Sequence, residues 1–220
     1  VFSQLTEESR GRFDPDAETP WTQALAQRDA ARMEQESTRI DSEATPIHPL
    51  RLCREVRDFI DRDAILCVDG NEILSFARHT IPTYFPGHRL NAGTHGTMGV
   101  GVPFGIAAKA AKPDKQVVVL TGDGSFGWNG MEVDTAVRND LPVLFVICNN
   151  GSMTAADEEF NPQKHLGFTS RYDKMMEALG GHGEFVERPD DIRPALERAY
   201  ASGKPALVNV IVDQYAKASS

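Results

Sequence analysis

Two short polar motifs in the second half of the sequence contain the residue types that hold a metal-bound phosphate. Asp123 stands between two glycines, directly after the apolar run 116–120, and Asn150 follows the next apolar run, 142–148. Magnesium is often held by one or two protein oxygens together with phosphate oxygens, so one carboxylate and one amide suffice when the ligand itself is anionic. The motifs favour a magnesium-bridged diphosphate if folding brings them together.

Each motif also has a purely structural interpretation. Glycines at 122 and 124 allow a tight turn, and Asp123 alone would serve as a helix cap. Asn150-Gly151 is a common hairpin turn. However, residues 152–159 lack the alternating pattern of a returning strand. The hairpin interpretation therefore fails, and a polar site at a strand end is favoured.

The apolar runs before these motifs predict the strands of a buried parallel sheet, because their apolar residues are consecutive. Four such runs occur, at 64–68, 116–120, 142–148 and 206–212. Helix-like segments accompany them, at 98–111, 130–139, 170–179 and 190–202, the last with Asp190 as its expected N-terminal cap. The alternation predicts an α/β fold, a three-layer domain with a central parallel sheet flanked by helices. Ligands bind such sheets beyond the carboxyl ends of the strands, where both motifs lie.

The polar segment 1–49 differs in composition from the rest of the chain. It is rich in acidic residues and contains one stretch, 22–40, that could form a helix with a thin apolar face. We interpret residues 1–49 as a linker or the tail of a preceding domain. Residues 50–220 are expected to form the single large domain, beginning with a helix whose apolar residues start at Leu50.

The overall charge and the cysteine content exclude several classes of partner and site. The net charge is −9, from 23 basic and 32 acidic residues, so neither a nucleic acid nor an anionic membrane is an expected partner. No apolar stretch approaches the roughly 18 residues that span a bilayer. Cys53, Cys67 and Cys148 are widely spaced. They are expected to be buried thiols in a reducing, cytoplasmic compartment.

The segment from the GDG motif to the NN motif resembles the signature of enzymes that depend on thiamine diphosphate (ThDP). Two motifs, a fixed interval and a strand–loop–helix context coincide in it. The resemblance implies ThDP and Mg²⁺ as cofactors, with Mg²⁺ held by Asp123, Asn150 and the carbonyl group of Ser152. It also assigns cofactor binding to Gly70, Asn71, Glu72, Gly96, Thr97, Met98, Gly122, Gly124, Ser125 and Met153. The loop 70–72 is also compatible with a plain capped turn.

A second glycine-rich loop, 91–99, is similar to the Gly-Thr-Met-Gly loop of the acetolactate synthase-like branch of this family. The resemblance implies that Met98 supports the folded cofactor and that the Gly96 carbonyl accepts a hydrogen bond from the aminopyrimidine. His95 would transfer protons or bind a substrate carbonyl, and Met153 and Thr154 would face the substrate. The alternatives are an ordinary core methionine and a histidine that only lines the loop.

The resemblance covers most of residues 50–212 and implies a lyase or carboligase that breaks or forms a carbon–carbon bond. The loop is most similar to 2-hydroxyacyl-CoA lyases, although relatives often carry another residue in place of His95. Acetolactate synthase-type condensation or decarboxylation of 2-keto acids is the alternative, and a non-catalytic cofactor-holding subunit is another. Family members also need a pyrimidine-binding domain, from a missing N-terminal part or a companion chain. A homodimer or homotetramer acting on a small acyl-CoA or 2-keto acid is expected.

Overall fold

The chain divides into two compact units, Val1–Thr38 and Arg39–Ser220. The computed structural model describes residues 1–12, 14, 17–157, 159, 161, 162, 164–167 and 170–218. The first unit contains helix α1 (Phe2–Ser9), which buries no residue, and most of helix α2 (Pro20–Ile40). The predicted helix over 22–40 is thus present as α2. Few large apolar residues occur in this unit, which explains its exposed helices.

The second unit begins before the composition of the chain changes at residue 50. Ile40 is buried, and Ile47 has no exposed surface. The N–H of Asp213 donates a hydrogen bond of 2.8 Å to the Ile47 carbonyl group. Two isolated apolar residues of the polar segment therefore pack into the core of the Arg39–Ser220 unit.

A six-stranded sheet forms the centre of this unit, in the order β2-β1-β3-β4-β6-β5. Every strand pair is parallel. The strands are β1 (Ile65–Asp69), β2 (Arg89–Leu90), β3 (Val117–Gly122), β4 (Leu144–Asn149), β5 (His182–Val186) and β6 (Ala206–Ile211). The parallel sheet confirms the predicted fold class.

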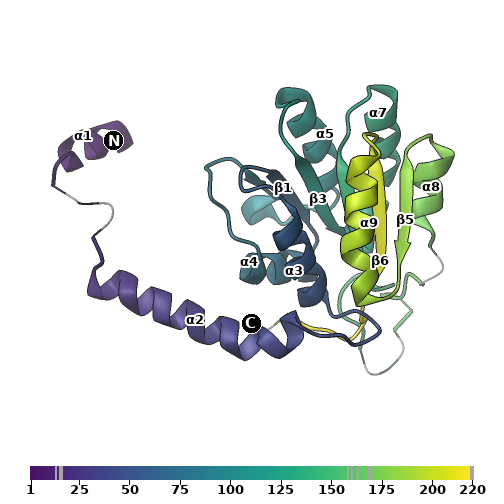
Figure 1. Cartoon of the computed structure of the whole chain (residues 1–220), viewed down its shortest axis with the longest axis horizontal. Helices are drawn as coiled ribbons and strands as arrows, with labels where there is room; N and C mark the ends of the chain where they lie inside the picture. The colour runs from purple at the N-terminus through teal and green to yellow at the C-terminus, as the bar shows by residue number, and fades with distance from the viewer. Residues whose placement is uncertain are drawn as a thin grey trace. The chain divides into compact units, whose positions relative to one another are not determined.

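Helices cover both faces of the sheet and produce three layers (Figure 1). Alternate strand residues, such as Val117 and Val119, pack with one set of helices in a single buried cluster. The helices of that layer are α5 (Gly101–Ala111), α6 (Asp123–Asn129), α7 (Val133–Arg138) and α8 (Tyr172–Ala178). The other layer consists of α3 (Pro49–Phe59), α4 (Asn71–Thr80) and α9 (Pro189–Ala201), with α3 in contact with both others. Two short 3-10 helices complete the set, η1 (Gly93–His95) and η2 (Gly130–Glu132).

The predicted cap of helix α9 is wrong. Arg188 is the residue before the helix, Pro189 is its first residue, and Asp190 lies within the first turn. Proline suits the first helical position because its φ angle is already helical and its missing N–H has no partner there anyway. The helix therefore starts one residue earlier than the acidic residue indicated.

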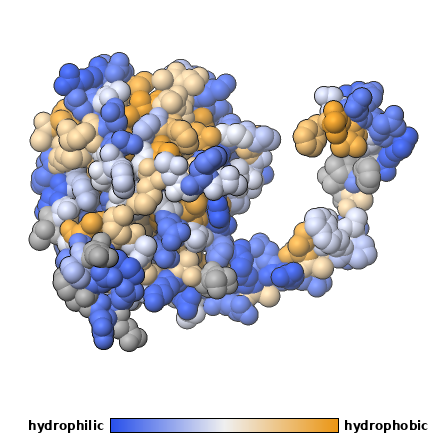
Figure 2. Space-filling view, turned by 180° about the vertical axis from the view of Figure 1, so that it is seen from behind, coloured by the Kyte–Doolittle hydropathy of each residue, from blue (hydrophilic) through white to orange (hydrophobic). Residues whose placement is uncertain are grey.

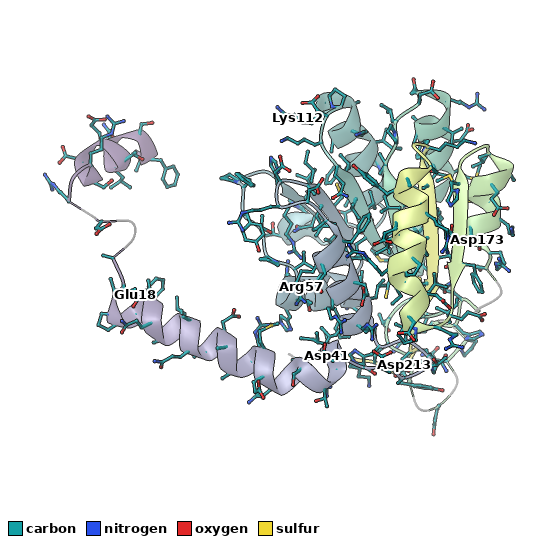
Figure 3. All side chains as sticks on the ribbon, viewed as in Figure 1. Glu18, Asp41, Arg57, Lys112, Asp173 and Asp213 are labelled. Carbon is teal, nitrogen blue, oxygen red and sulfur yellow. The ribbon has the colours of Figure 1, made fainter. Side chains whose placement is uncertain are left out.

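The strand order creates a crevice at the carboxyl edge of the sheet. From β1 the chain first adds β2 on one side and then returns to add β3 on the other side. Helices diverge at such a reversal, and ligands bind there. In Figure 3 the labelled Asp213 marks this carboxyl edge, and Lys112 marks the opposite edge.

All three cysteines are buried and form no disulfide with one another. None of the described helices is both long enough and apolar enough to cross a membrane.

Candidate functional site

The loop after β1 and the loop after β3 touch each other at the crevice. Gly70 has a φ angle of 121°, a conformation that side-chain-bearing residues rarely adopt. A Cβ atom at this position would lie 3.3 Å from Ser125 Oγ and 3.4 Å from the backbone nitrogen of Gly122. Glycine at 70 therefore leaves the two loops in close contact and keeps backbone groups accessible between them.

The loop after β4 packs against the same place. A Cβ atom on Gly124 would lie 3.1 Å from Met153 Sδ. The backbone N–H groups of Asn150 and Gly151 lie close enough to Asp123 to lower the pKa of its carboxyl group. The GDG and NN motifs, separate in the sequence, are therefore neighbours in the fold.

These three loops line one pocket with an empty volume of about 440 Å³. Its predicted site residues are Gly70, Asn71, Glu72, Gly122, Asp123, Gly124, Ser125, Asn150, Ser152, Met153 and Thr154. The lining also includes residues without a predicted site role, among them Phe76, Cys148 and Asp213. Cys148 lies near the carboxyl end of β4 and Asp213 follows β6, so both occupy the same edge of the sheet. The register of the parallel strands brings such residues to the pocket, although they belong to no sequence motif.

Asp123 is the group in this pocket with the most unusual environment. It is 2% exposed, and within the described part of the chain its Oδ2 atom has no hydrogen-bond partner. Burial raises the pKa of Asp123 to about 6, although the nearby N–H groups of Gly124, Gly151 and Asn150 lower it in part. An ionised carboxylate without a partner is costly to bury. A bound cation would remove that cost.

The pocket does not contain a cluster of conventional metal ligands. Among the described residues, no group of three or more histidine, cysteine, aspartate or glutamate side chains converges on one point. A cation held beside Asp123 would need further oxygens from side-chain amides, from main-chain carbonyl groups and from a bound anionic molecule. Magnesium accepts such a mixed oxygen set.

The two consecutive asparagines after β4 have different partners. Asn150 Oδ1 accepts the N–H of Ser152 at 3.1 Å, and Asn150 Nδ2 donates to the Thr154 carbonyl group at 3.1 Å. Asn149 is fully buried, and its Oδ1 accepts the N–H of Gly151 at 3.1 Å. Asn150 thus shapes the turn at the pocket, while Asn149 anchors the turn to the strand.

Asn149 is itself held by a buried polar chain that the sequence analysis missed. Asn149 Nδ2 donates to Asn209 Oδ1 at 3.2 Å, and Asn209 Nδ2 donates to the Ser170 carbonyl group at 3.0 Å. A polar residue at 209, inside the apolar run 206–212, was the available signal. Buried amides need partners, so a lone asparagine in such a run indicates a polar contact across the sheet.

A second pocket, with an empty volume of about 560 Å³, lies beside the first. The two pockets share Gly70 and Asn71. The second is lined by Gly96, Thr97 and Met98, with Met98 half-buried. His95 is exposed at the end of η1, and the described residues that line either pocket do not include it. The cofactor loops predicted from the sequence therefore border two adjacent pockets, with His95 outside both.

Glu72 is turned towards the C-terminal segment. It belongs to the first turn of α4, and its Oε2 accepts the N–H of Ala218 at 3.2 Å. Ala216, from the same segment, lines the first pocket. Residues beyond β6 thus form part of the pocket wall.

Comparisons with known proteins agree with this geometry. Residues 70–210 match the family model "Thiamine pyrophosphate enzyme, C-terminal TPP binding domain". The chain is 41% identical over 202 residues to a probable acetolactate synthase of Mycobacterium bovis, a match that covers 88% of this chain and 36% of that protein. It is 36% identical over 216 residues to a 2-hydroxyacyl-CoA lyase of Oryza sativa, covering 91% and 37%. An oxalyl-CoA decarboxylase of Escherichia coli is 34% identical over 190 residues, covering 83% and 34%.

A solved structure has the same fold. The 4-hydroxybenzoylformate decarboxylase of Rhodococcus jostii superposes with a TM-score of 0.71 at 24% identity, over 78% of this chain and 34% of that one. The chain thus spans a little over a third of the length of the curated relatives it matches. Because the family model covers most of the chain and the relatives exceed 30% identity, the chain belongs to the thiamine pyrophosphate enzymes and contains their C-terminal cofactor-binding domain.

Proposed function

We propose that this chain holds the diphosphate group and the Mg²⁺ ion of ThDP in an enzyme that breaks or forms a carbon–carbon bond beside a carbonyl group. The observation that carries the proposal is the buried Oδ2 of Asp123, which has no hydrogen-bond partner within the described residues. Asp123 lines a pocket formed by three glycine-containing loops at the reversal point of the sheet.

Mg²⁺ would be held by Asp123, by the side chain of Asn150 and by the carbonyl group of Ser152. All three residues line the first pocket. A divalent cation favours the ionised form of a carboxylate that burial alone disfavours. The backbone N–H groups at Gly70–Asn71, where α4 begins, and at Gly122–Ser125 would bind the diphosphate oxygens, because helix N-termini and glycine loops present N–H groups to anions.

The ring end of the cofactor would lie in the second pocket, which Gly96, Thr97 and Met98 line. When bound there, ThDP would supply the electron sink that bond cleavage beside a carbonyl group requires. Met98 would support the folded cofactor, and the Gly96 carbonyl group would accept a hydrogen bond from the aminopyrimidine. These two residues would hold and orient the ring end of the cofactor.

His95 and Thr154 are the side chains that we assign to substrate contact. Thr154 lines the first pocket. His95 is exposed at the end of η1, on the loop that supplies Gly96, Thr97 and Met98 to the second pocket. Met153, in contact range of Gly124, would complete the wall between the diphosphate and the substrate.

A second protein surface would close this site. Exposed apolar side chains include Phe104 on α5, Trp128 on α6 and Met131 on η2. Figure 2 shows apolar patches among the polar surface of this unit. Such patches favour a protein neighbour, and we propose a pyrimidine-binding domain in a homodimer or homotetramer.

The substrate class has two candidates. The similarity of the loop 91–99 to 2-hydroxyacyl-CoA lyases, together with 36% identity to the Oryza sativa lyase, supports a 2-hydroxyacyl-CoA substrate. The 41% identity to an acetolactate synthase supports condensation of two 2-keto acids. Both reactions use the same cofactor site, so the site residues assigned above serve either reaction.

Replacing Asp123 by asparagine tests the metal assignment. We expect Asp123→Asn to weaken Mg²⁺-dependent ThDP binding by about 100-fold or more, because residues that merely orient metal ligands already cost 10- to 100-fold when changed. Titration calorimetry of the full-length protein with ThDP at a saturating Mg²⁺ concentration measures the effect. Asp114→Asn, an exposed carboxylate before β3, is the control and should bind as the wild type does. Unchanged affinity in Asp123→Asn would refute the assignment.

A further inference from the structure

We propose that Asp69 is a positioning residue that couples the loops assigned to the diphosphate, at 70–71 and 122–125, to the loop 91–99, which contains Met98 and is called the Met98 loop below. The proposal rests on the proposed function. Asp69 is the last residue of β1, directly before Gly70, and it is 4% exposed. It lines the second pocket.

The first contact of Asp69 fixes the start of helix α5. Its Oδ2 accepts a buried hydrogen bond of 2.9 Å from the N–H of Gly101, the first residue of α5. Val100, which precedes the helix, makes no side-chain cap hydrogen bond. The Asp69 carboxylate, from strand β1, thus caps the N-terminus of α5. Met98 and Gly99 come just before this helix, so the contact also sets where the Met98 loop leaves the sheet.

The contact is tight because residue 101 is a glycine. A Cβ atom at 101 would lie 2.7 Å from Asp69 Cβ and 3.3 Å from Asp69 Oδ2. The backbone of α5 therefore rests directly on the Asp69 side chain. A small displacement of either group moves the other.

The remaining neighbours of the Asp69 carboxylate come from the other cofactor loops. The backbone N–H groups of Gly99 and Gly70 and the hydroxyl group of Ser125 all lie close enough to favour its ionised form. The Ser125 hydroxyl is buried and lacks a hydrogen bond of good geometry with any described residue. The loops at 70, 99 and 125 thus meet around one side chain.

Gly99 is held from its other side by helix α6, which follows the GDG motif. Asn129 Nδ2 donates to the Gly99 carbonyl group at 2.8 Å. Gly99 has a φ angle of 88°, and a Cβ atom there would lie 2.7 Å from Trp128 Cβ. The Met98 loop is therefore clamped between Asp69 and the helix that begins at Asp123.

Only a carboxylate fits the centre of this cluster. Three backbone N–H groups and one hydroxyl group lie around the Asp69 carboxylate, and all four are hydrogen-bond donors. A carboxylate accepts on both oxygens, whereas an asparagine amide must turn its NH₂ group towards some of these donors. Asp69→Asn has nearly the same size, yet it leaves donors unpaired and pushes the loops apart.

The test compares Asp69→Asn with a matched control in the full-length protein. Glu184→Gln is the control, because Glu184 is a partly buried acid on the edge strand β5 that accepts hydrogen bonds from His182 at 2.9 Å and Arg198 at 2.7 Å. Calorimetry gives the dissociation constant of ThDP with Mg²⁺, and proton NMR gives the rate of deuterium exchange at the thiazolium C–H of the bound cofactor. Calorimetry separates affinity from the fraction of folded protein, so a partly unfolded variant is still measurable.

We expect Asp69→Asn to weaken ThDP binding about tenfold and to slow the exchange up to about 100-fold, because a shift of about 1 Å at a reacting group has effects of that size. Glu184→Gln should leave both quantities within twofold of the wild type, as ~0.4 kcal/mol or less separates such values. If Asp69→Asn matches the wild type, or if Glu184→Gln shows the same losses, the positioning role is overturned.

Two further outcomes are distinguishable. A wild-type protein that fails to bind ThDP with Mg²⁺ refutes the proposed function itself, and the positioning role with it. If Asp69→Asn does not fold, the variant Asn129→Ala tests the coupling instead. Asn129 is exposed, and its replacement removes the hydrogen bond that holds the Gly99 carbonyl group on the side away from Asp69. Wild-type exchange in Asn129→Ala would then refute the coupling, and slower exchange would support it.

Discussion

At the scale of single residues, the buried carboxylates of this protein differ in what surrounds them. Burial raises the pKa of both Asp69 and Asp123, and the hydrogen-bond donors around each carboxyl group lower it only in part, with no cation beside either group in the described structure. Asp173, which is 1% exposed, is held by Arg171 through hydrogen bonds of 2.9 and 2.6 Å. Carboxylates with a raised pKa lie at the pocket, whereas Asp173 serves α8. A raised pKa at a pocket is typical of functional acids.

Asp173 predicts a pH dependence of stability. Burial raises its pKa, but the hydrogen bonds and charge of Arg171 outweigh burial and leave the pKa below the ordinary value. Because the folded pKa is the lower one, Asp173 stabilises the fold above about pH 4 and loses that contribution as the pH falls through the folded pKa. Asp173→Asn should lower the free energy of unfolding by roughly 1 kcal/mol at pH 7, and by progressively less towards pH 3.

Urea unfolding at both pH values measures the difference. Asp134→Asn is a suitable control, because Asp134 pairs with the exposed Arg138 side chain and should contribute less than about 0.5 kcal/mol. A loss in Asp173→Asn that stays constant from pH 7 to pH 3 would contradict the assigned pKa direction.

At the scale of elements, the close approach of α5 to the sheet determines where the Met98 loop lies. Gly101 and Gly105 stand one helical turn apart on the face of α5 that meets the sheet, and Cβ atoms there would lie 2.7 Å from Asp69 and 2.2 Å from Val119. Helix α5 contacts both β1 and β3. The glycines therefore let the helix backbone rest on the two strands that border the crevice.

Gly105→Ala is expected to destabilise the protein by about 1–3 kcal/mol, because the added methyl group must displace Val119 or the helix. Gly127→Ala is the matched control: a Cβ atom at 127 has no neighbour within 4 Å, and α6 should gain up to about 1 kcal/mol from the better helix former. Chemical denaturation of both variants gives the two free energies. Equal stability of Gly105→Ala and the wild type would mean that α5 is free to shift.

The elements also divide into those that local sequence predicts and those that it does not. The four strands found as consecutive apolar runs are β1, β3, β4 and β6, which occupy the middle of the sheet. Strands β2 and β5 escaped prediction because they are edge strands, mostly half-buried, and their sequences lack such runs. Helix α4 was missed because it begins directly after Gly70, inside a segment that reads as a polar turn.

At the scale of the whole molecule, the pocket opens at the carboxyl edge, and the chain corresponds to roughly a third of its relatives' length. Residues on one cofactor-binding domain determine that a cofactor is held, whereas substrate choice depends on short loops and on neighbouring domains. The relatives therefore point to the same cofactor but to several different substrates.

The full-length protein, supplied with ThDP and Mg²⁺, is expected to release formyl-CoA from a 2-hydroxyacyl-CoA faster than it forms acetolactate from pyruvate. The physical reason is the similarity of the loop 91–99, which borders the second pocket, to the loop of the lyases. Parallel assays at equal enzyme concentration measure both rates. A dominant acetolactate rate would favour the condensation alternative, and a protein that binds ThDP with Mg²⁺ yet catalyses neither reaction would support a cofactor-holding subunit.

The sequence by itself determined the residue types of the site, the central strands and the family resemblance, because these depend on local patterns: consecutive apolar residues, paired glycines and a fixed interval between Asp123 and Asn150. Only the tertiary structure decided which loops meet. Asp69, Asn129 and Asn209 acquire their contacts from strand order and from helices that arrive from distant parts of the chain. His95 is exposed outside both pockets, which no local pattern indicates. Burial and the direction of a side chain arise from packing, and packing is a property of the whole fold.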